Sequence, residues 1–322
     1  MFTQDDLAAA AAVVGAVMPP TPQYAWPLLA RRAGAEVWVK HENHTPIGAF
    51  KVRGGLVYMD RLRRGSPNVS GVISATRGNH GQSIALAARR AGLTATILVP
   101  HGNSTEKNAA MRALGAELVE HGRDFDEAKH HCAALARERG LHFVPSFHEH
   151  LVLGVATYGV EFMRAVPELH TVYVPIGMGS GLCGVIAARD ALGLKTDVVG
   201  VVAENAPAVA LSFAAGHIVP TNTAATFADG MACREPHEEA LAIMRKGAAR
   251  LVTVSEDDIS AAIRAYYEDT HNLAEGAGAA ALAALLKERS TMAGRRVGVI
   301  LSGGNIDRAV FQEVLAGTTP KA

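Results

Sequence analysis

Four short segments of the sequence combine a reactive side chain with glycines or small neighbours, and these are the places where chemistry is expected. The first segment spans residues 46–55 (PIGAFKVRGG), in which Lys51 follows Phe50 among small and apolar side chains. Apolar surroundings disfavour the ammonium form and lower the pKa of a lysine. The neutral amine can form an imine with an aldehyde and later accept a proton from a substrate. The alternative is a solvated surface lysine, which is the common situation for this residue.

The second segment spans residues 74–82 (SATRGNHGQ) and lies between an expected strand and an expected helix. A helix N-terminus binds anions through its free backbone N–H groups and the helix dipole, so it suits a substrate carboxylate as well as a phosphate. Within this segment, Asn79 is a candidate donor to a phenolic oxygen of a cofactor. The candidate substrate contacts are Ser74, Thr76, Arg77, Gly78 and His80. An ordinary helix cap with a turn is the structural alternative.

The third segment is a glycine-rich loop in residues 174–184 (VPIGMGSGLCG), which leaves an expected strand and opens a helix. Glycines let the backbone wrap closely around a phosphate. The residues predicted to do so are Gly177, Met178, Gly179, Ser180 and Gly181. The same loop contains the pattern G-x-G-x-x-G with Glu204 about twenty residues later, which is the dinucleotide fingerprint. A dinucleotide-binding protein therefore stays an alternative, although it gives no role to the segment around Lys51.

The fourth segment, residues 301–307 (LSGGNID), ends a strand with a hydroxyl and two glycines, where ligands bind in open parallel sheets. Ser302 is a candidate hydrogen-bond partner for a pyridine nitrogen. Unlike a carboxylate, a hydroxyl does not hold that nitrogen in its protonated form. A pyridine ring that is not protonated withdraws electrons less strongly. A carbanion next to such a ring is therefore expected to expel a β-leaving group promptly.

Alternating β-branched runs and Ala-rich helical patterns must position these segments, and such alternation indicates a parallel α/β fold. Strands are predicted at 72–74, 95–100 and 117–120, and helices at 80–91, 104–114 and 125–138. A second set of strands is predicted at 172–175, 197–202 and 297–301. We expect two α/β lobes, each an open and mostly parallel sheet flanked by helices. The predicted domains are a small one over residues 48–148 and a large one formed by residues 1–47 and 149–322.

Composition limits the classes of partner. The 322 residues are 49% hydrophobic and carry 31 basic and 31 acidic side chains, so no basic field is available for nucleic acid. No segment reaches the apolar length of a membrane span, and the acidic N-terminal segment is expected to form an amphipathic helix rather than a signal peptide. Three scattered cysteines favour a reducing cytoplasm. We therefore expect a cytoplasmic protein with a small-molecule partner.

Two histidine-rich stretches, residues 130–132 (HHC) and 148–150 (HEH), contain side chains that bind metals elsewhere. Neither stretch has regular zinc-ligand spacing, and adjacent residues on a helix point in different directions. The sequence therefore predicts no transition-metal site.

In this order, the four segments resemble the fold-type II pyridoxal-phosphate family, specifically its serine/threonine dehydratase and serine racemase branch. Residues 228–232 (ADGMA), 254–259 (VSEDDI) and 272–279 (NLAEGAGA) add to the resemblance, which covers nearly the whole chain. It implies a tryptophan synthase β-like fold, a homodimer and pyridoxal 5'-phosphate as cofactor. It also implies that Lys51 forms the imine with the cofactor and that Phe50 packs beside the ring. Further implied contacts are Asn79 to the 3'-oxygen, residues 177–181 to the phosphate, and Ser302 to the ring nitrogen.

Three departures from the family pattern affect the expected substrate. Met178 and Ser180 interrupt a run that is usually four glycines. Arg77 stands where the family's serine racemases carry a serine that donates a proton, which makes racemisation less favoured. Residues 154–157 read GVAT where the family commonly has GQGT.

The sequence thus predicts a dehydratase, or ammonia-lyase, that converts a 3-hydroxy amino acid of the threonine or serine type into a 2-oxo acid and ammonia. The apolar changes favour an arylserine such as phenylserine. Arg77 favours hydroxyaspartate, because guanidinium binds carboxylates, although guanidinium also stacks on aromatic rings. The same fold also suits a racemase, a β-replacing synthase or a cofactor-binding protein without turnover, and these three functions stay open.

Overall fold

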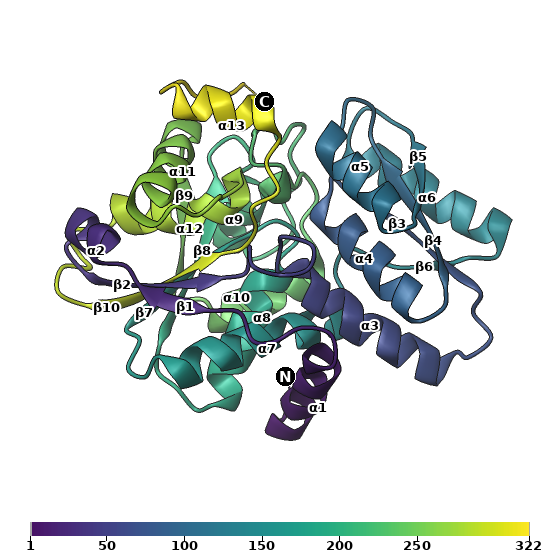
Figure 1. Cartoon of the computed structure of the whole chain (residues 1–322), viewed down its shortest axis with the longest axis horizontal. Coiled ribbons are helices and arrows are strands. Elements are labelled where there is room, and N and C mark those ends of the chain that lie inside the picture. The colour runs from purple at the N-terminus through teal and green to yellow at the C-terminus, as the bar shows by residue number, and fades with distance from the viewer. Residues whose placement is uncertain (1, 322) are drawn as a thin grey trace.

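The larger of two β-sheets organises the N-terminal segment and the C-terminal half of the chain in the computed structural model, which describes residues 2–321 (Figure 1). Its strand order is β1-β2-β10-β7-β8-β9, with β1 antiparallel to β2 and the other neighbours parallel. The strands are β1 (Gln23–Ala25), β2 (Glu36–His41), β7 (Thr171–Pro175), β8 (Asp197–Ala203), β9 (Arg250–Val254) and β10 (Arg296–Leu301).

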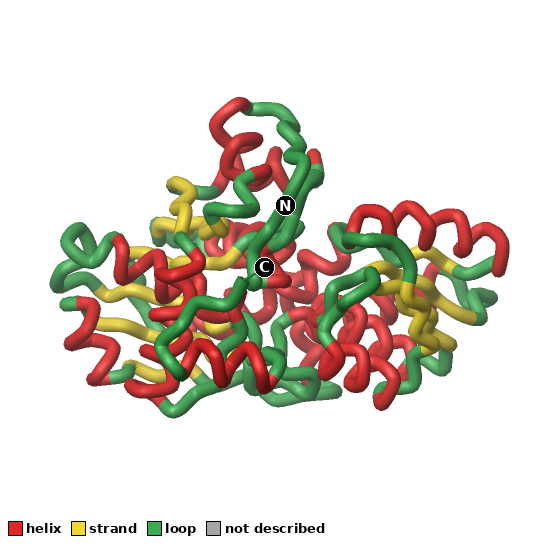
Figure 2. The backbone as a smooth tube through the Cα atoms, turned by 90° about the horizontal axis from the view of Figure 1, so that it is seen from above, coloured by secondary structure: helices red, strands yellow, loops and turns green. Residues whose placement is uncertain are grey.

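Helices, red in Figure 2, surround the strands of this sheet, which are yellow. They are α2 (Pro27–Ala33), α7 (Glu149–Ala165), α8 (Ser180–Ala191), α9 (Ala208–Ala215), α10 (Glu238–Gly247), α11 (Glu256–Thr270), α12 (Gly276–Lys287) and α13 (Arg308–Leu315), with the 3-10 turn η1 at Asp229–Met231. The apolar β-branched strands β7, β8 and β10 are buried almost throughout, as parallel strands between two helix layers must be.

The smaller sheet forms the second lobe, on the right in Figure 1. Its four strands are all parallel in the order β5-β4-β3-β6. They are β3 (Gly71–Ala75), β4 (Thr94–Val99), β5 (Glu117–Glu120) and β6 (His142–Phe143), and the helices around them are α4 (Asn79–Arg90), α5 (Thr105–Ala113) and α6 (Phe125–Arg139). The Ser104 hydroxyl caps α5 by accepting from the Lys107 N–H, and Gly140 ends α6 in the left-handed conformation.

Helix α3 (Lys51–Gly65) lies at the junction of the two lobes, packed against both α4 and α7, and α1 (Gln4–Gly15) packs against α3 and α7. Small residues permit this close approach. A Cβ at Gly154 of α7 would lie 2.3 Å from the Arg53 carbonyl oxygen, and one at Gly55 would lie 2.2 Å from the Ser83 Oγ of α4. Backbone contact on both sides therefore fixes the helix whose first residue is Lys51.

A buried cluster of charges anchors the first turn of α3. Arg53 is fully buried and donates to Glu42 at 2.7 Å, to Glu161 at 2.6 Å and to the Thr157 hydroxyl at 3.1 Å. Lys40 of β2 donates to the same Glu161 at 2.7 Å. Breaking such a cluster by removing one partner leaves an uncompensated buried charge, so these contacts hold α3 in one position.

The fold class predicted from the sequence is confirmed: two mostly parallel α/β sheets are flanked by helices. The predicted strand at 117–120 coincides with β5, and the other predicted strands lie within one or two residues of β3, β4, β7, β8 and β10. No sequence pattern predicted β1, β2, β6 or β9. The domain boundaries at residues 48 and 148 stay a prediction, with the small sheet spanning residues 71–143. Within residues 2–321, no helix is both long and apolar enough to cross a membrane.

Candidate active site

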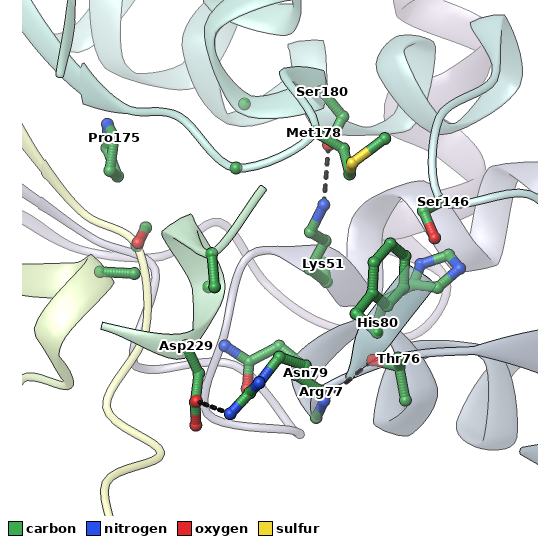
Figure 3. A pocket seen from close by; sticks show the side chains of 18 of the residues that line it. Lys51, Thr76, Arg77, Asn79, His80, Ser146, Pro175, Met178, Ser180 and Asp229 are labelled. Carbon is green, nitrogen blue, oxygen red and sulfur yellow. Dashed lines mark hydrogen bonds and ion pairs between the residues drawn. The ribbon is translucent and has the colours of Figure 1, made fainter. Parts of the chain in front are cut away.

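A pocket between the two lobes, at the carboxyl ends of parallel strands, collects nearly all the residues singled out in the sequence (Figure 3). Lys51 enters from the start of α3, the β3–α4 turn supplies residues 75–80, the β7–α8 loop supplies residues 177–181, and Ser302 follows β10. The remaining lining is Phe50, Lys107, Phe125, Ser146, Pro175, Asp229, Gly230, Ala232, Glu275 and Ala277. Ligands in open α/β sheets bind at this edge.

Lys51 is the reactive centre of the pocket. Its Nζ donates to the Ser180 hydroxyl at 2.9 Å and lies 5.0 Å from the centre of the Phe50 ring. Burial lowers the pKa of Lys51 from 10.5 to about 8, because no carboxylate offsets the loss of water around the ammonium. The side chain is therefore a base with a substantial neutral fraction near neutral pH.

The loop of residues 177–181 forms an anion cradle at the N-terminus of α8. Gly179 caps the helix with φ 102, a conformation that favours glycine. A Cβ at Gly177 would lie 2.1 Å from the Gly230 carbonyl oxygen, so the loop packs against residue 230 with no room for a side chain. The backbone N–H groups at the start of α8 are therefore accessible to a phosphate.

Met178, which the sequence left unexplained, has a packing role. The Cys233 thiol donates to its sulfur at 3.6 Å, and Met178 packs against the apolar cluster that contains Cys183 and Met244. Its side chain thus supports the loop from one side while lining the pocket on the other.

The β3–α4 turn presents a second helix N-terminus. The Thr76 hydroxyl accepts from the Gly78 N–H at 2.9 Å and the Gly81 N–H at 3.2 Å. At Gly78, φ is 156 and a Cβ would lie 2.4 Å from Cδ of Lys107, so only glycine fits. The N–H groups of Asn79 and His80, which open α4, are placed to bind a carboxylate.

Asn79 is held in one orientation. Its amide nitrogen donates to Glu275, and its amide oxygen accepts from the Asn305 side chain at 2.8 Å. Asn305 also donates to the Ile47 carbonyl oxygen at 2.8 Å, which fixes it in turn. The second amide hydrogen of Asn79 remains for a ligand in the pocket.

His80 and Ser74 lie deeper in the small lobe. His80 Nε2 lies 3.1 Å from the Ser74 Oγ, and burial, aided by repulsion from Lys51, lowers the pKa of His80 to about 3. The Ser74 hydroxyl donates to the Val144 carbonyl oxygen, and Ser74 does not belong to the pocket lining. Ser74 is therefore buried outside the pocket lining, and its contact to substrate stays a prediction.

Four charged residues, Arg77, Lys107, Asp229 and Glu275, line the pocket and were not recognised together from the sequence. Figure 3 shows the pair formed by Arg77 and Asp229. The Arg77 guanidinium donates to Asp229 at 2.8 Å, and Lys107 lies 3.3 Å from Asp229 and 3.1 Å from Glu275. Burial opposes the charged form of Lys107, but the two carboxylates outweigh it and raise its pKa. Lys107 had no sequence signal, since it lies in α5 of the small lobe, whereas its partners Asp229 and Glu275 belong to the large lobe.

Ser302 closes the pocket where β10 ends. It is 4% exposed, and its carbonyl oxygen accepts from the Phe50 N–H at 3.0 Å. The end of β10 is thereby tied to the residue before Lys51. Among residues 2–321, no group of three or more His, Cys, Asp or Glu side chains has an arrangement that could hold a metal ion.

Comparison with solved structures defines the class of protein. Threonine deaminase isoform 2 from Solanum lycopersicum superposes with a TM-score of 0.88 at 32% identity, over 98% of this chain and 95% of the other. Maize serine racemase gives 0.90 at 25% identity, over 98% and 97%. A pyridoxal 5'-phosphate-dependent aspartate racemase gives 0.89 at 27% identity, over 95% and 96%. The two-lobed fold is therefore shared with these enzymes, one of which is named as pyridoxal 5'-phosphate-dependent.

Sequence comparison names the family. The profile described as pyridoxal-phosphate dependent enzyme matches residues 16–303, and the chain belongs to this family. An L-threonine ammonia-lyase from Geobacter sulfurreducens is 38% identical over 86% of this chain and 69% of its own length. One from Thermotoga maritima is 33% identical over 89% of this chain and 72% of its own length.

The residues of the pocket fit pyridoxal 5'-phosphate. The desolvated amine of Lys51 suits an aldehyde, and the loop of residues 177–181 at the N-terminus of α8 suits a phosphate. The fixed amide of Asn79 and the buried hydroxyl of Ser302 offer partners for the ring substituents. The dinucleotide alternative is not supported, since Glu204 does not belong to the pocket lining.

Proposed function

We propose that this protein removes water and then ammonia from a 3-hydroxy amino acid, which makes it a carbon–oxygen lyase that releases a 2-oxo acid. The observation that supports this proposal most directly is the desolvated amine of Lys51. It lies in one pocket with the loop of residues 177–181 and the N-terminus of α4. Relatives named L-threonine ammonia-lyase, 33% and 38% identical, support the same class of reaction.

The cofactor, when bound, supplies an electron sink for the negative charge at the substrate Cα. Residues 177–181 would hold its phosphate, Lys51 its aldehyde carbon, and Asn79 and Ser302 the ring. The N-terminus of α4 binds and orients the substrate carboxylate. When cofactor and substrate are bound, the neutral amine of Lys51 would take the proton from the substrate Cα. Loss of the 3-hydroxyl as water then gives an enamine, whose tautomer is hydrolysed to the 2-oxo acid and ammonia.

The individual roles of these residues are part of the proposal. Lys51→Ala is expected to abolish turnover, because it removes the base. Ser302→Ala is expected to have a milder effect, because it removes a single hydrogen bond, worth about 0.5–1.5 kcal/mol, and leaves the base in place. Equal losses in the two variants would contradict this division of roles.

Two further parts of the proposal concern assembly and location. We propose a homodimer, as the resemblance implies, to be tested by light scattering on the purified protein. A reducing cytoplasm is supported by the cysteines Cys132, Cys183 and Cys233, all buried and free. Burial raises the pKa of the Cys132 and Cys233 thiols to about 12, so both side chains stay in the poorly reactive thiol form.

The substrate side chain is the open part of the function, with threonine, serine, phenylserine and hydroxyaspartate as candidates. The test is to measure release of ammonia and 2-oxo acid from each, as kcat/KM. One strong substrate supports dehydration. If none reacts while the protein binds the cofactor, dehydration is excluded, and thiol replacement and racemisation are tested instead.

A racemase is the second candidate, because solved serine and aspartate racemases match the fold closely. A racemase inverts L-serine without net loss of amino acid, which chiral chromatography detects. The presence of Arg77 beside Gly78, where the resembled racemases carry a serine, favours elimination instead.

A further inference from the structure

We propose that Arg77 forms a subsite for a second carboxylate, so that the preferred substrates are 3-hydroxy amino dicarboxylic acids. This inference rests on the proposed dehydration and narrows its substrate class. Arg77 lines the pocket and directly precedes Gly78, the cap of α4. An acid bound through one carboxylate at the α4 N-terminus therefore has the guanidinium close to its other end.

The hydrogen bonding of Arg77 is incomplete. One nitrogen of the fork, Nη2, donates to Asp229 at 2.8 Å. The Nε atom is buried and has no hydrogen-bond partner among residues 2–321. A buried donor without a partner is costly, and a planar guanidinium satisfies two donors at once by binding a carboxylate in a bidentate manner. The open donor thus favours a ligand with a carboxylate.

Asp229 has a second cationic partner besides Arg77. Its second carboxylate oxygen lies 3.3 Å from Nζ of Lys107, which is itself paired with Glu275 at 3.1 Å. If a substrate carboxylate takes the guanidinium, Asp229 keeps a buried cationic partner and is not left unpaired. A substrate carboxylate can therefore replace the Asp229 carboxylate at Arg77 while every buried charge keeps a partner of opposite sign.

An aromatic substrate is the competing occupant, because guanidinium also stacks on rings. Stacking leaves the Nε hydrogen without an acceptor, whereas a carboxylate accepts from it. The hydrogen-bonding state of Arg77 therefore favours the dicarboxylate over phenylserine.

The first test compares substrates in Arg77→Gln and in a control, Arg112→Gln. Arg112 lies on the same lobe and is exposed, 3.6 Å from Glu120. Charged hydrogen bonds contribute about 1.5–3 kcal/mol, so the ratio of kcat/KM for threo-3-hydroxyaspartate to that for L-threonine should fall about 10–150-fold. The control should keep the wild-type ratio. An unchanged ratio in Arg77→Gln, or a preference of the wild type for phenylserine, overturns the inference.

The second test does not depend on turnover. Succinate and butyrate, which differ by one carboxylate, are titrated calorimetrically into the cofactor-loaded protein. Succinate should bind at least about tenfold more tightly, and Arg77→Gln should remove this advantage. Equal binding of the two acids to the wild type overturns the inference. If threonine is dehydrated but hydroxyaspartate is not, the dicarboxylate inference fails and the proposed function stands, whereas inertness toward every hydroxy amino acid removes the proposed function itself.

Discussion

The lowered pKa of Lys51 can be tested through the pH dependence of cofactor uptake. A shift from 10.5 to about 8 raises the neutral fraction of the amine at pH 7 about 300-fold relative to an ordinary lysine. At pH 9 the advantage is only about 30-fold, because an ordinary lysine is then itself partly neutral. The reactivity of Lys51 relative to a free lysine should therefore fall about tenfold between pH 7 and pH 9.

The assay is the rate at which cofactor-free protein forms the imine with pyridoxal 5'-phosphate, followed by absorbance. Each rate is divided by that of Nα-acetyl-lysine amide in the same buffer, so that ionisations of the cofactor cancel. His80 does not titrate in this range, because its pKa is about 3. A normalised rate that stays constant from pH 7 to pH 9 would show that Lys51 titrates as a solvated lysine, and it would refute the desolvation argument.

Two further predictions concern the loop of residues 177–181 and the buried charge cluster around Arg53, which anchors α3. Gly177→Ala should weaken cofactor binding at least about tenfold, as measured by fluorescence titration, because its Cβ would lie 2.1 Å from the Gly230 carbonyl oxygen. Gly15→Ala, where the Cβ meets open space, should bind normally; equal affinities would contradict the cradle. Arg53→Met should destabilise the protein by about 3–5 kcal/mol in urea unfolding. Arg64→Met, an exposed position on the same helix, should cost less than about 1 kcal/mol, and similar losses would show that the buried cluster is not an anchor.

The sequence predicted those parts of the fold that depend on local patterns. Buried runs such as residues 72–74 and 297–301 are β-branched and bounded by turns, so their strands could be recognised directly. Strand β6 has only two residues and β1 three, which is too short for a period to be seen. Pairing between β2 and β10, more than 250 residues apart, comes from tertiary packing, which no local pattern contains.

The candidate site was predictable where each function belongs to one continuous segment. The lysine segment, the two glycine turns and Ser302 carry their chemistry in neighbouring residues. Lys107 could not be predicted, because its role depends on Asp229 and Glu275, which only the meeting of the two lobes brings to it. Ser74 is the opposite case, since its neighbours in sequence line the pocket while its own hydroxyl donates to the Val144 carbonyl oxygen.

The most direct test of the central claim is the stoichiometry of products from the best hydroxy amino acid, measured in wild type and in Lys51→Ala, both incubated with cofactor. If Lys51 is the base for elimination, the wild type releases ammonia and 2-oxo acid in equal amounts and the variant releases neither. Release by Lys51→Ala at a rate near that of the wild type would contradict the account.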